Sequence, residues 1–210
     1  MVRLLLADDH EIVREGLRHI LQARSDWQVV AEAADGKEAV RKAIDTNPDV
    51  AIVDYALPLL NGIEVTRQIR SRLEDTEVLI FTMHDSDIVI EQLLNAGAGG
   101  YLLKSDANKS LIKAVDALAN HELFFTGRVA ATLLSSFLAL PKQSGMPLSG
   151  RECSVVQLIA EGYTNKEVGN LLHISAKTVD SHRTAVMRKL KLGSAAGLVR
   201  YAIRNRIVEP

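Results

Sequence analysis

The chain has 210 residues, 47% of them hydrophobic and 24% charged, which are the proportions of an ordinary globular protein. It has no apolar run of the roughly 18 residues that a membrane-spanning helix needs, no signal-peptide pattern and one cysteine, so we expect a cytoplasmic protein without a membrane partner or an internal disulfide. The net charge of −1 combines −7 over residues 1–140 with +6 over residues 141–210, which favours two domains and makes the second a candidate for binding nucleic acid.

The first 118 residues alternate short apolar runs with segments of helical length and period. Such strands, apolar throughout and separated by helices, are typical of βαβ units and of a parallel sheet that is covered on both faces. We therefore predict an α/β fold with a doubly wound, five-stranded parallel sheet, of the flavodoxin-like kind. The predicted strands are 2–6, 28–32, 50–53, 78–81 and 101–103, and the predicted helices are 12–21, 36–46, 62–72, 88–95 and 109–119.

The second part of the chain is predicted to be helical throughout. Residues 126–139 have the pattern of an amphipathic helix, and the following PKQSGMP, with two prolines and a glycine, predicts a flexible linker. Four short helices follow, and Ser175 is a candidate N-cap for the third. The predicted helices are 150–161, 165–172, 175–190 and 195–205, and the predicted division is a domain over 1–125, a linker helix and linker over 126–146, and a small all-α domain over 147–210.

Polar residues follow four of the predicted strands. Asp8 and Asp9 end the first strand, Asp54 the third, Thr82 the fourth and Lys104 the fifth. In an open α/β sheet, ligands bind outside the carboxyl ends of the strands, at the point where the strand order reverses. With the order 2-1-3-4-5, the three aspartates converge there and the other two residues flank them.

Three carboxylates in one cleft suit Mg²⁺, which prefers oxygen ligands and would supply the positive charge that adjacent aspartates need. A lysine at the rim can hold a phosphate, a threonine hydroxyl can bond it, and a carboxylate can accept a phosphoryl group. Asp54 is the best candidate for the acceptor, because it ends the central strand and precedes a loop that contains Pro58. Each aspartate alone could be a turn residue or an N-cap; five matching residues at four strand ends favour the site.

Residues 2–118 resemble the receiver domain of two-component response regulators, through the motifs LLLADDH, VDYALP, FTMH and GAGGYLLK. The resemblance implies that Asp54 is phosphorylated by a cognate sensor histidine kinase. It also implies that Asp9 binds Mg²⁺ directly, that Asp8 holds metal-bound water, and that Asp54 and the backbone carbonyl of Ala56 are further ligands.

The same resemblance assigns three residues to the response to phosphorylation. It implies that Lys104 contacts the phosphoryl group and that Thr82 and Tyr101 form a switch pair, in which Tyr101 turns inward once Asp54 is modified. The alternative for Tyr101 is an aromatic residue that packs in the core at the end of a strand.

A helix–turn–helix pattern occupies the middle of the basic domain, over residues 158–190. Its second helix has an apolar side and a basic side, and a recognition helix places its N-terminal half in the major groove. Lysine, arginine and threonine there bind phosphates, while aspartate, serine and threonine can contact base edges. The alternative is a solvated helix face. The predicted DNA-binding residues are Lys166, Lys177, Thr178, Asp180, Ser181, Arg183, Thr184 and Arg188.

Residues 148–208 resemble the LuxR-type DNA-binding domain of NarL/FixJ-like regulators, through LSGRE, LIAEGYTNKEV, HISAKTV, SHR and LVRYAIRNRIV. The two resemblances together imply a transcription regulator that binds double-stranded DNA and is switched by phosphorylation. They also imply a homodimer in the phosphorylated state, with the last helix as a contact between the copies, and RNA polymerase is a further candidate partner.

Three other functions fit parts of the sequence. Phosphotransferases and phosphatases of the haloacid dehalogenase type also form an aspartyl phosphate with Mg²⁺, but they carry a second aspartate where this chain has Ala56, so we predict that the protein is not an enzyme. The lysines and arginines of one helix argue against a domain that binds only protein. The complete five-residue site argues against a receiver that is never phosphorylated.

Overall fold

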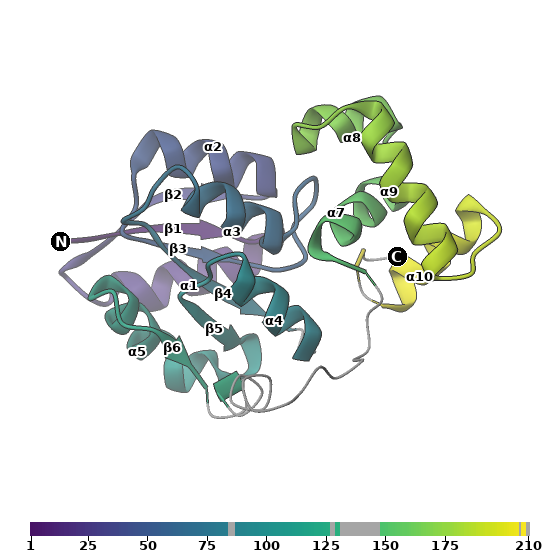
Figure 1. The fold of residues 1–210 in the computed structure, drawn as a ribbon. Helices are drawn as coiled ribbons and strands as arrows, with labels where there is room; N and C mark the ends of the chain where they lie inside the picture. The colour runs from purple at the N-terminus through teal and green to yellow at the C-terminus, as the bar shows by residue number, and fades with distance from the viewer. Residues whose placement is uncertain (84–86, 127–128, 131–147, 206, 209–210) are drawn as a thin grey trace.

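The computed structural model describes residues 1–83, 87–126, 129–130, 148–205 and 207–208. They form an α/β part, which contains the whole sheet, and a helical part that packs against one end of it (Figure 1). Within these ranges no helix is long and apolar enough to cross a membrane. The predicted helix over 126–139 and the linker after it lie almost entirely outside the described residues.

The sheet is parallel and has the strand order β2-β1-β3-β4-β5-β6. The predicted doubly wound parallel sheet is thus confirmed, with β1 and β3 as neighbours and the strand order reversing between them. The strands are β1 (Val2–Ala7), β2 (Trp27–Ala33), β3 (Val50–Val53), β4 (Glu77–Thr82), β5 (Gly100–Leu103) and β6 (Phe124–Phe125).

The sixth strand corrects the predicted number of five. β6 extends the sheet next to β5, with Phe124 opposite Gly100 and Phe125 opposite Tyr101. The Phe124 N–H donates to the Gly99 carbonyl at 3.1 Å. Two residues are too few to show an alternating pattern, so only the position of this segment beside β5 makes it a strand.

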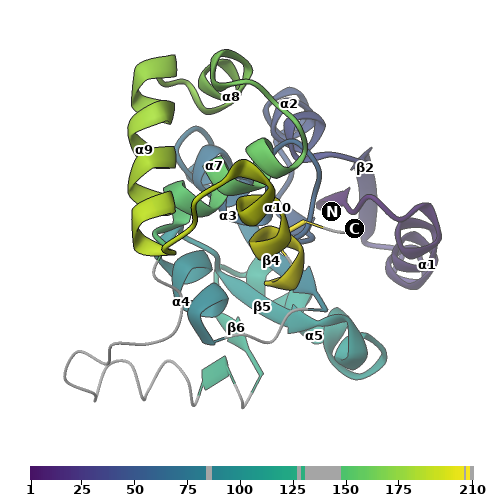
Figure 2. The ribbon, with the colours of Figure 1, turned by 90° about the vertical axis from the view of Figure 1, so that its right-hand side faces the viewer.

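Helices cover both faces of the sheet, as Figure 2 shows: α1 and α5 on one face, and α2, α3 and α4 on the other. The pleat divides the strand residues accordingly, since Leu4 and Leu6 of β1 pack on the α1 side while Leu5 and Ala7 pack on the α2 side. The helices are α1 (Glu11–Gln22), α2 (Gly36–Thr46), α3 (Gly62–Arg70), α4 (Asp87–Asn95) and α5 (Ala107–Ala119), with a 3₁₀ turn, η1 (Lys104–Asp106), before α5.

The helical part consists of α7 (Gly150–Ala160), α8 (Asn165–Leu172), α9 (Ala176–Lys189) and α10 (Ala195–Arg204), close to the predicted ranges. Side-chain caps explain where these helices begin. Ser149 and Thr164 form capping boxes with Glu152 and Glu167. The Ser175 side chain accepts from the Thr178 N–H, which confirms it as the N-cap of α9.

Glu152 also ties α7 to α9. Its side chain is 6% exposed, and both of its oxygens accept from Lys189 Nζ at 2.7 Å. Burial raises the pKa of the Glu152 carboxyl, but the bonds from Lys189 and Ser149 outweigh it and hold the pKa below its usual range. A carboxyl with a lowered pKa stabilises the folded state at neutral pH and loses that contribution as the pH falls through its folded-state pKa.

We expect Glu152→Gln to lower the stability of the helical part by about 1 kcal/mol at neutral pH, because Lys189 is 40% exposed and water screens the pair. Hydrogen exchange of α7 and α9 peptides measures the loss. The exposed Glu15→Gln is the control, and it should leave this exchange unchanged. Wild type and variant should converge as the pH falls through the folded-state pKa of Glu152, which lies below its usual value; a difference that does not depend on pH would contradict this interpretation.

Candidate functional site

The carboxyl ends of the strands place Asp8, Asp54, Thr82 and Lys104 around one point. Asp8 follows β1, Asp54 follows β3 and Thr82 ends β4, and their exposed fractions are 1%, 5% and 0%. Lys104 follows β5, and its Nζ lies 2.6 Å from Asp8 Oδ2 and 2.7 Å from Asp54 Oδ2. In this structure the positive charge beside the buried aspartates therefore comes from the lysine.

Burial and the neighbouring charges shift the pKa values of Lys104 and its partners in opposite directions. Burial raises the pKa of Asp8, and the bond from Lys104 offsets this only in part, so the pKa stays above its usual value. Burial would lower the pKa of Lys104, but Asp54 and Asp8 together raise it above its usual value. Lys104 therefore remains an ammonium group at neutral pH, the form that can bind a phosphoryl oxygen.

Oxygen atoms near this lysine fit a hard divalent cation. Asp54 Oδ1 is buried and has no hydrogen-bond partner among the described residues. One ligand atom from each of Asp8, Asp9 and His10 lies within 4.8 Å of the others. Mg²⁺ prefers carboxylate oxygens and keeps several of its waters, which suits an Asp9 side chain that is 28% exposed.

His10 was missed by the sequence analysis, although its position directly after two aspartates was a usable signal. Its Nδ1 lies 2.8 Å from Asp9 Oδ1 and 3.4 Å from Asp8 Oδ1. Asp9 is the main reason that the pKa of His10 is raised. The imidazole, which is half exposed, thus lies beside both aspartates at the open side of the site.

The loop after β3 holds Asp54 in place through the start of α3. The Gly62 N–H donates to the Tyr55 carbonyl at 2.8 Å. A Cβ at Gly62 would lie 2.8 Å from the Asp54 carbonyl oxygen, so the close approach of α3 requires glycine. Leu59 has a φ of +66°, a strained conformation for a branched side chain. Ala56 lies half-buried in this loop, two residues after Asp54.

Tyr101 is already inside the protein. It lies on β5, opposite Ile80 of β4, and is 1% exposed. No exposed position is left from which its side chain could turn inward, so this structure does not show the rotation that the resemblance implies.

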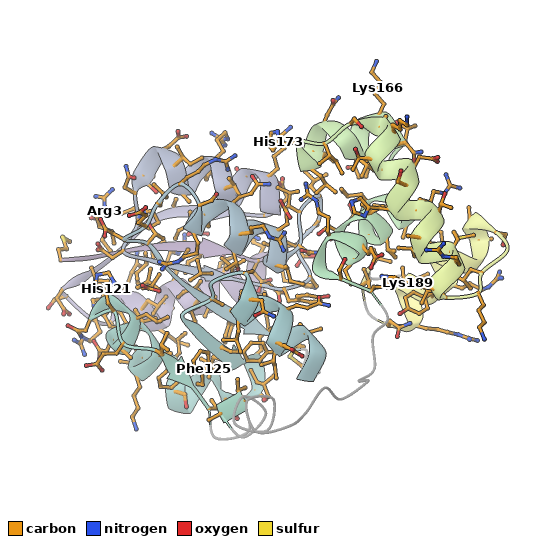
Figure 3. All side chains as sticks on the ribbon, in the orientation of Figure 1. Arg3, His121, Phe125, Lys166, His173 and Lys189 are labelled. Carbon is orange, nitrogen blue, oxygen red and sulfur yellow. The ribbon has the colours of Figure 1, made fainter. Side chains whose placement is uncertain are left out.

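The predicted DNA-binding residues lie mainly on one exposed face of the helical part. On α9, Lys177, Asp180 and Thr184 are exposed and Arg183 is half exposed. Lys166 extends from the end of α8 that points away from the sheet (Figure 3). The exposed set is Lys166, Lys177, Thr178, Asp180, Ser181, Thr184 and Arg188.

Asp180 has a partner that the sequence did not indicate. Its Oδ1 accepts from Asn165 Nδ2 of α8 at 3.3 Å. The bond is exposed to solvent, so it is easily exchanged for water or for another donor.

The helical part docks on the loop that carries the aspartate site. Gln157 Nε2 of α7 donates to the Leu57 carbonyl at 2.8 Å, and the Leu59 N–H donates to Glu161 Oε2 at 3.3 Å. Leu57 and Leu59 are three and five residues after Asp54 in the chain. Contacts that link residues about 100 positions apart leave no local signal in a sequence, so this interface was not predicted.

A buried carboxylate and a shared apolar core complete this interface. Glu64 of α3, whose side chain is 4% exposed, accepts from Arg151 of α7 at 2.9 Å and also pairs with Arg67. The apolar cluster that contains Leu57 continues into Leu158 of α7. The side of the helical part that faces the α/β part is therefore α7 and the end of α8, while the basic face of α9 stays open.

The chain joins a doubly wound α/β unit, which has aspartates and a lysine at its strand ends, to a helix–turn–helix unit. This combination defines a regulator with one part that receives a signal and another that binds DNA. Two family models match the chain: "Response regulator receiver domain" over residues 4–116 and "Bacterial regulatory proteins, luxR family" over residues 146–202. The chain belongs to the response regulators that combine these two domains, and the predicted function in transcription regulation is confirmed.

Similar proteins extend over the whole chain. The oxygen regulatory protein NreC of Staphylococcus epidermidis is 37% identical, and the transcriptional regulatory protein LiaR of Bacillus subtilis is 39% identical; each match covers 99% of this chain and 100% of the relative. Among solved structures, RcsB of Salmonella enterica bound to promoter rprA with phosphomimetic BeF₃⁻ is 27% identical, covers 95% of this chain and 97% of that chain, and has a TM-score of 0.68.

Proposed function

We propose that a sensor histidine kinase phosphorylates Asp54 in the presence of Mg²⁺, and that this controls how the helical part binds DNA. The observation that carries the proposal is the bond between Gln157 of α7 and the Leu57 carbonyl, three residues after Asp54. A change at Asp54 therefore reaches the DNA-binding part through one short loop. DNA binding with and without the phosphate mimic BeF₃⁻, at matched salt, tests this: equal affinities would contradict it.

The residues at the strand ends have separate roles in this proposal. Asp9, Asp54 and the Ala56 carbonyl would hold Mg²⁺ directly and Asp8 would hold metal-bound water; the ion would supply the positive charge that neutralises the incoming phosphoryl group. The Asp54 carboxylate attacks the phosphorus, and the bond to the donor's leaving group breaks as the new P–O bond forms. Lys104 exchanges its bond to Asp54 for one to a phosphoryl oxygen, because it stays charged.

Phosphorylation then acts on the loop. It adds a charge of about −1.5 to −2 and three strong acceptors beside Asp54. Thr82 and Lys104 turn to these acceptors, and the loop that includes the strained Leu59 shifts, which weakens the bonds to α7. Because Tyr101 is already buried, its part in the switch is repacking within the core.

The remaining predictions belong to the same proposal. The receiver spans 1–125, the linker helix and linker 126–146, and the DNA-binding domain 147–210, in the cytoplasm, where bacterial DNA lies. RcsB dimers have been solved on DNA, which supports double-stranded DNA as the ligand and a homodimer as the bound form. RNA polymerase is a further proposed partner, and no enzymatic turnover of a substrate is part of the function.

Asp180 is expected to read a base, with cytosine N4 as its donor. The bond from Asn165 is exposed, so a base can replace it. Asp180→Ala should relax the preference at one position, by about 1–3 kcal/mol, and leave total affinity similar. Selection of binding sites from a random library measures this, with Lys177→Ala as the comparison, because a lost phosphate contact weakens all sequences alike and reduces the salt dependence. An unchanged selected motif would contradict the assignment.

The last helix is expected to join two copies on DNA. Leu198 and Ala202 are fully buried in the helical part, which leaves Val199, half exposed, and Ile203, 38% exposed, for the second copy. Ile203→Glu should weaken binding to a full site, whose half-sites lie about one helical turn apart, more than binding to a half-site. The exposed Arg200→Ala is the control. If the ratio of full-site affinity to half-site affinity is the same in Ile203→Glu and wild type, this contact is ruled out.

A further inference from the structure

A basic cleft lies between the two parts of the molecule, away from the aspartate site and from the open face of α9. One cavity of this cleft, of about 390 Å³, is bounded by α2 and α3 on one side and by the end of α8 on the other. A second hollow continues it along α3 and shares Gln68, Arg72 and His173 with it. Figure 3 shows His173 at the end of α8 that faces α2.

The polar lining of the cavity beside α2 carries positive charge that the protein does not fully neutralise. Lys37 has no ion pair or hydrogen bond among the described residues, and the Arg72 guanidinium donates only to the neutral Gln68 side chain, at 3.0 Å. Arg41 is shared by Glu38 and Asp45, each at 3.7 Å. These cations converge on one cleft although residues 1–140 have a net charge of −7.

The rest of the lining is apolar. Val40 and Ile44 of α2 face the cleft together with Leu60 and with Leu171 of α8. Glu64, the acid of the second hollow, is already balanced by Arg67 and Arg151. The volume lies within the range of pockets that bind small molecules, which are mostly apolar with a few polar groups that fix orientation.

We propose that this cleft binds a small phosphate monoester with an apolar or aromatic body, of the size of a nucleoside monophosphate. Lys37 and Arg72 would hold the phosphate, since an ammonium and a guanidinium are the usual partners of phosphate oxygens. The apolar residues would cover the body of the ligand.

The test uses the full-length protein, free of Mg²⁺, and isothermal titration with AMP, GMP, CMP and UMP at low salt. At least one nucleotide is expected to bind saturably, and its nucleoside and inorganic phosphate should each bind at least tenfold more weakly. Arg72→Ala and Lys37→Ala should each weaken nucleotide binding at least tenfold, whereas Lys113→Ala, an exposed lysine of α5, should not. No saturable binding, or equal binding by Arg72→Ala, would overturn the proposal.

The position of the cleft also predicts how its ligand affects DNA binding. This prediction rests on the proposed function. A ligand that touches both parts favours the docked arrangement, and where release of the helical part raises DNA affinity, linkage makes this ligand oppose DNA binding. The bound nucleotide is expected to lower DNA affinity severalfold in wild type and not in Arg72→Ala. If the nucleotide binds as expected but DNA affinity does not change, the predicted effect on DNA binding is wrong, whereas the proposed binding site is supported.

Discussion

Asp54→Asn is expected to abolish Mg²⁺-dependent labelling of the protein by a radioactive phosphodonor or by a phosphorylated sensor kinase. An amide is a poor nucleophile and a poor ligand for a hard cation, so the substitution removes the acceptor and one metal ligand together. The side chains are nearly equal in size, and Asp54 is 5% exposed, so the fold has little reason to change. This is the largest effect that the structure predicts for one substitution.

Two further variants make this result specific. Asp75→Asn, an exposed aspartate outside the site, is the matched control and should be labelled like wild type. Asp9→Ala should also lose labelling, but through the metal, so a high Mg²⁺ concentration should restore part of it. If Asp54→Asn takes up phosphate at the wild-type rate, another residue is the acceptor and the assignment of the site is wrong.

Gln157→Ala is expected to raise the DNA affinity of the unphosphorylated protein about five- to tenfold. The variant loses the bond to the Leu57 carbonyl, and one buried hydrogen bond contributes about 0.5–1.5 kcal/mol. Gln157 lies on α7, away from the open face of α9, so the DNA contacts themselves remain. Fluorescence anisotropy with labelled operator DNA measures both states of the protein.

The effect should be confined to the docked state. With BeF₃⁻ bound, Gln157→Ala and wild type should bind DNA equally well, because the helical part is then already released. Gln28→Ala, an exposed glutamine of β2, is the control and should behave like wild type in both states. An equal gain in affinity with and without BeF₃⁻ would mean that Gln157 acts on DNA binding directly and not through the interface.

The sequence by itself determined the parallel sheet, the order of its elements and the helices of the basic part. Short apolar strands, helical periods and capping residues such as Ser175 are local features, and each is visible within a few neighbouring residues. It also indicated that Asp8, Asp54, Thr82 and Lys104 meet, because a parallel sheet brings the carboxyl ends of its strands to one edge.

Only the tertiary structure decided what depends on contacts between distant segments. It placed Lys104 between Asp8 and Asp54, buried Tyr101, gave Asp180 a partner on α8 and added β6 at the edge of the sheet. It also set α7 on the loop after Asp54 and opened the basic cleft beside α2. These features join residues that are up to about 100 positions apart, and no local pattern of hydrophobicity or charge specifies which distant surfaces will pack together.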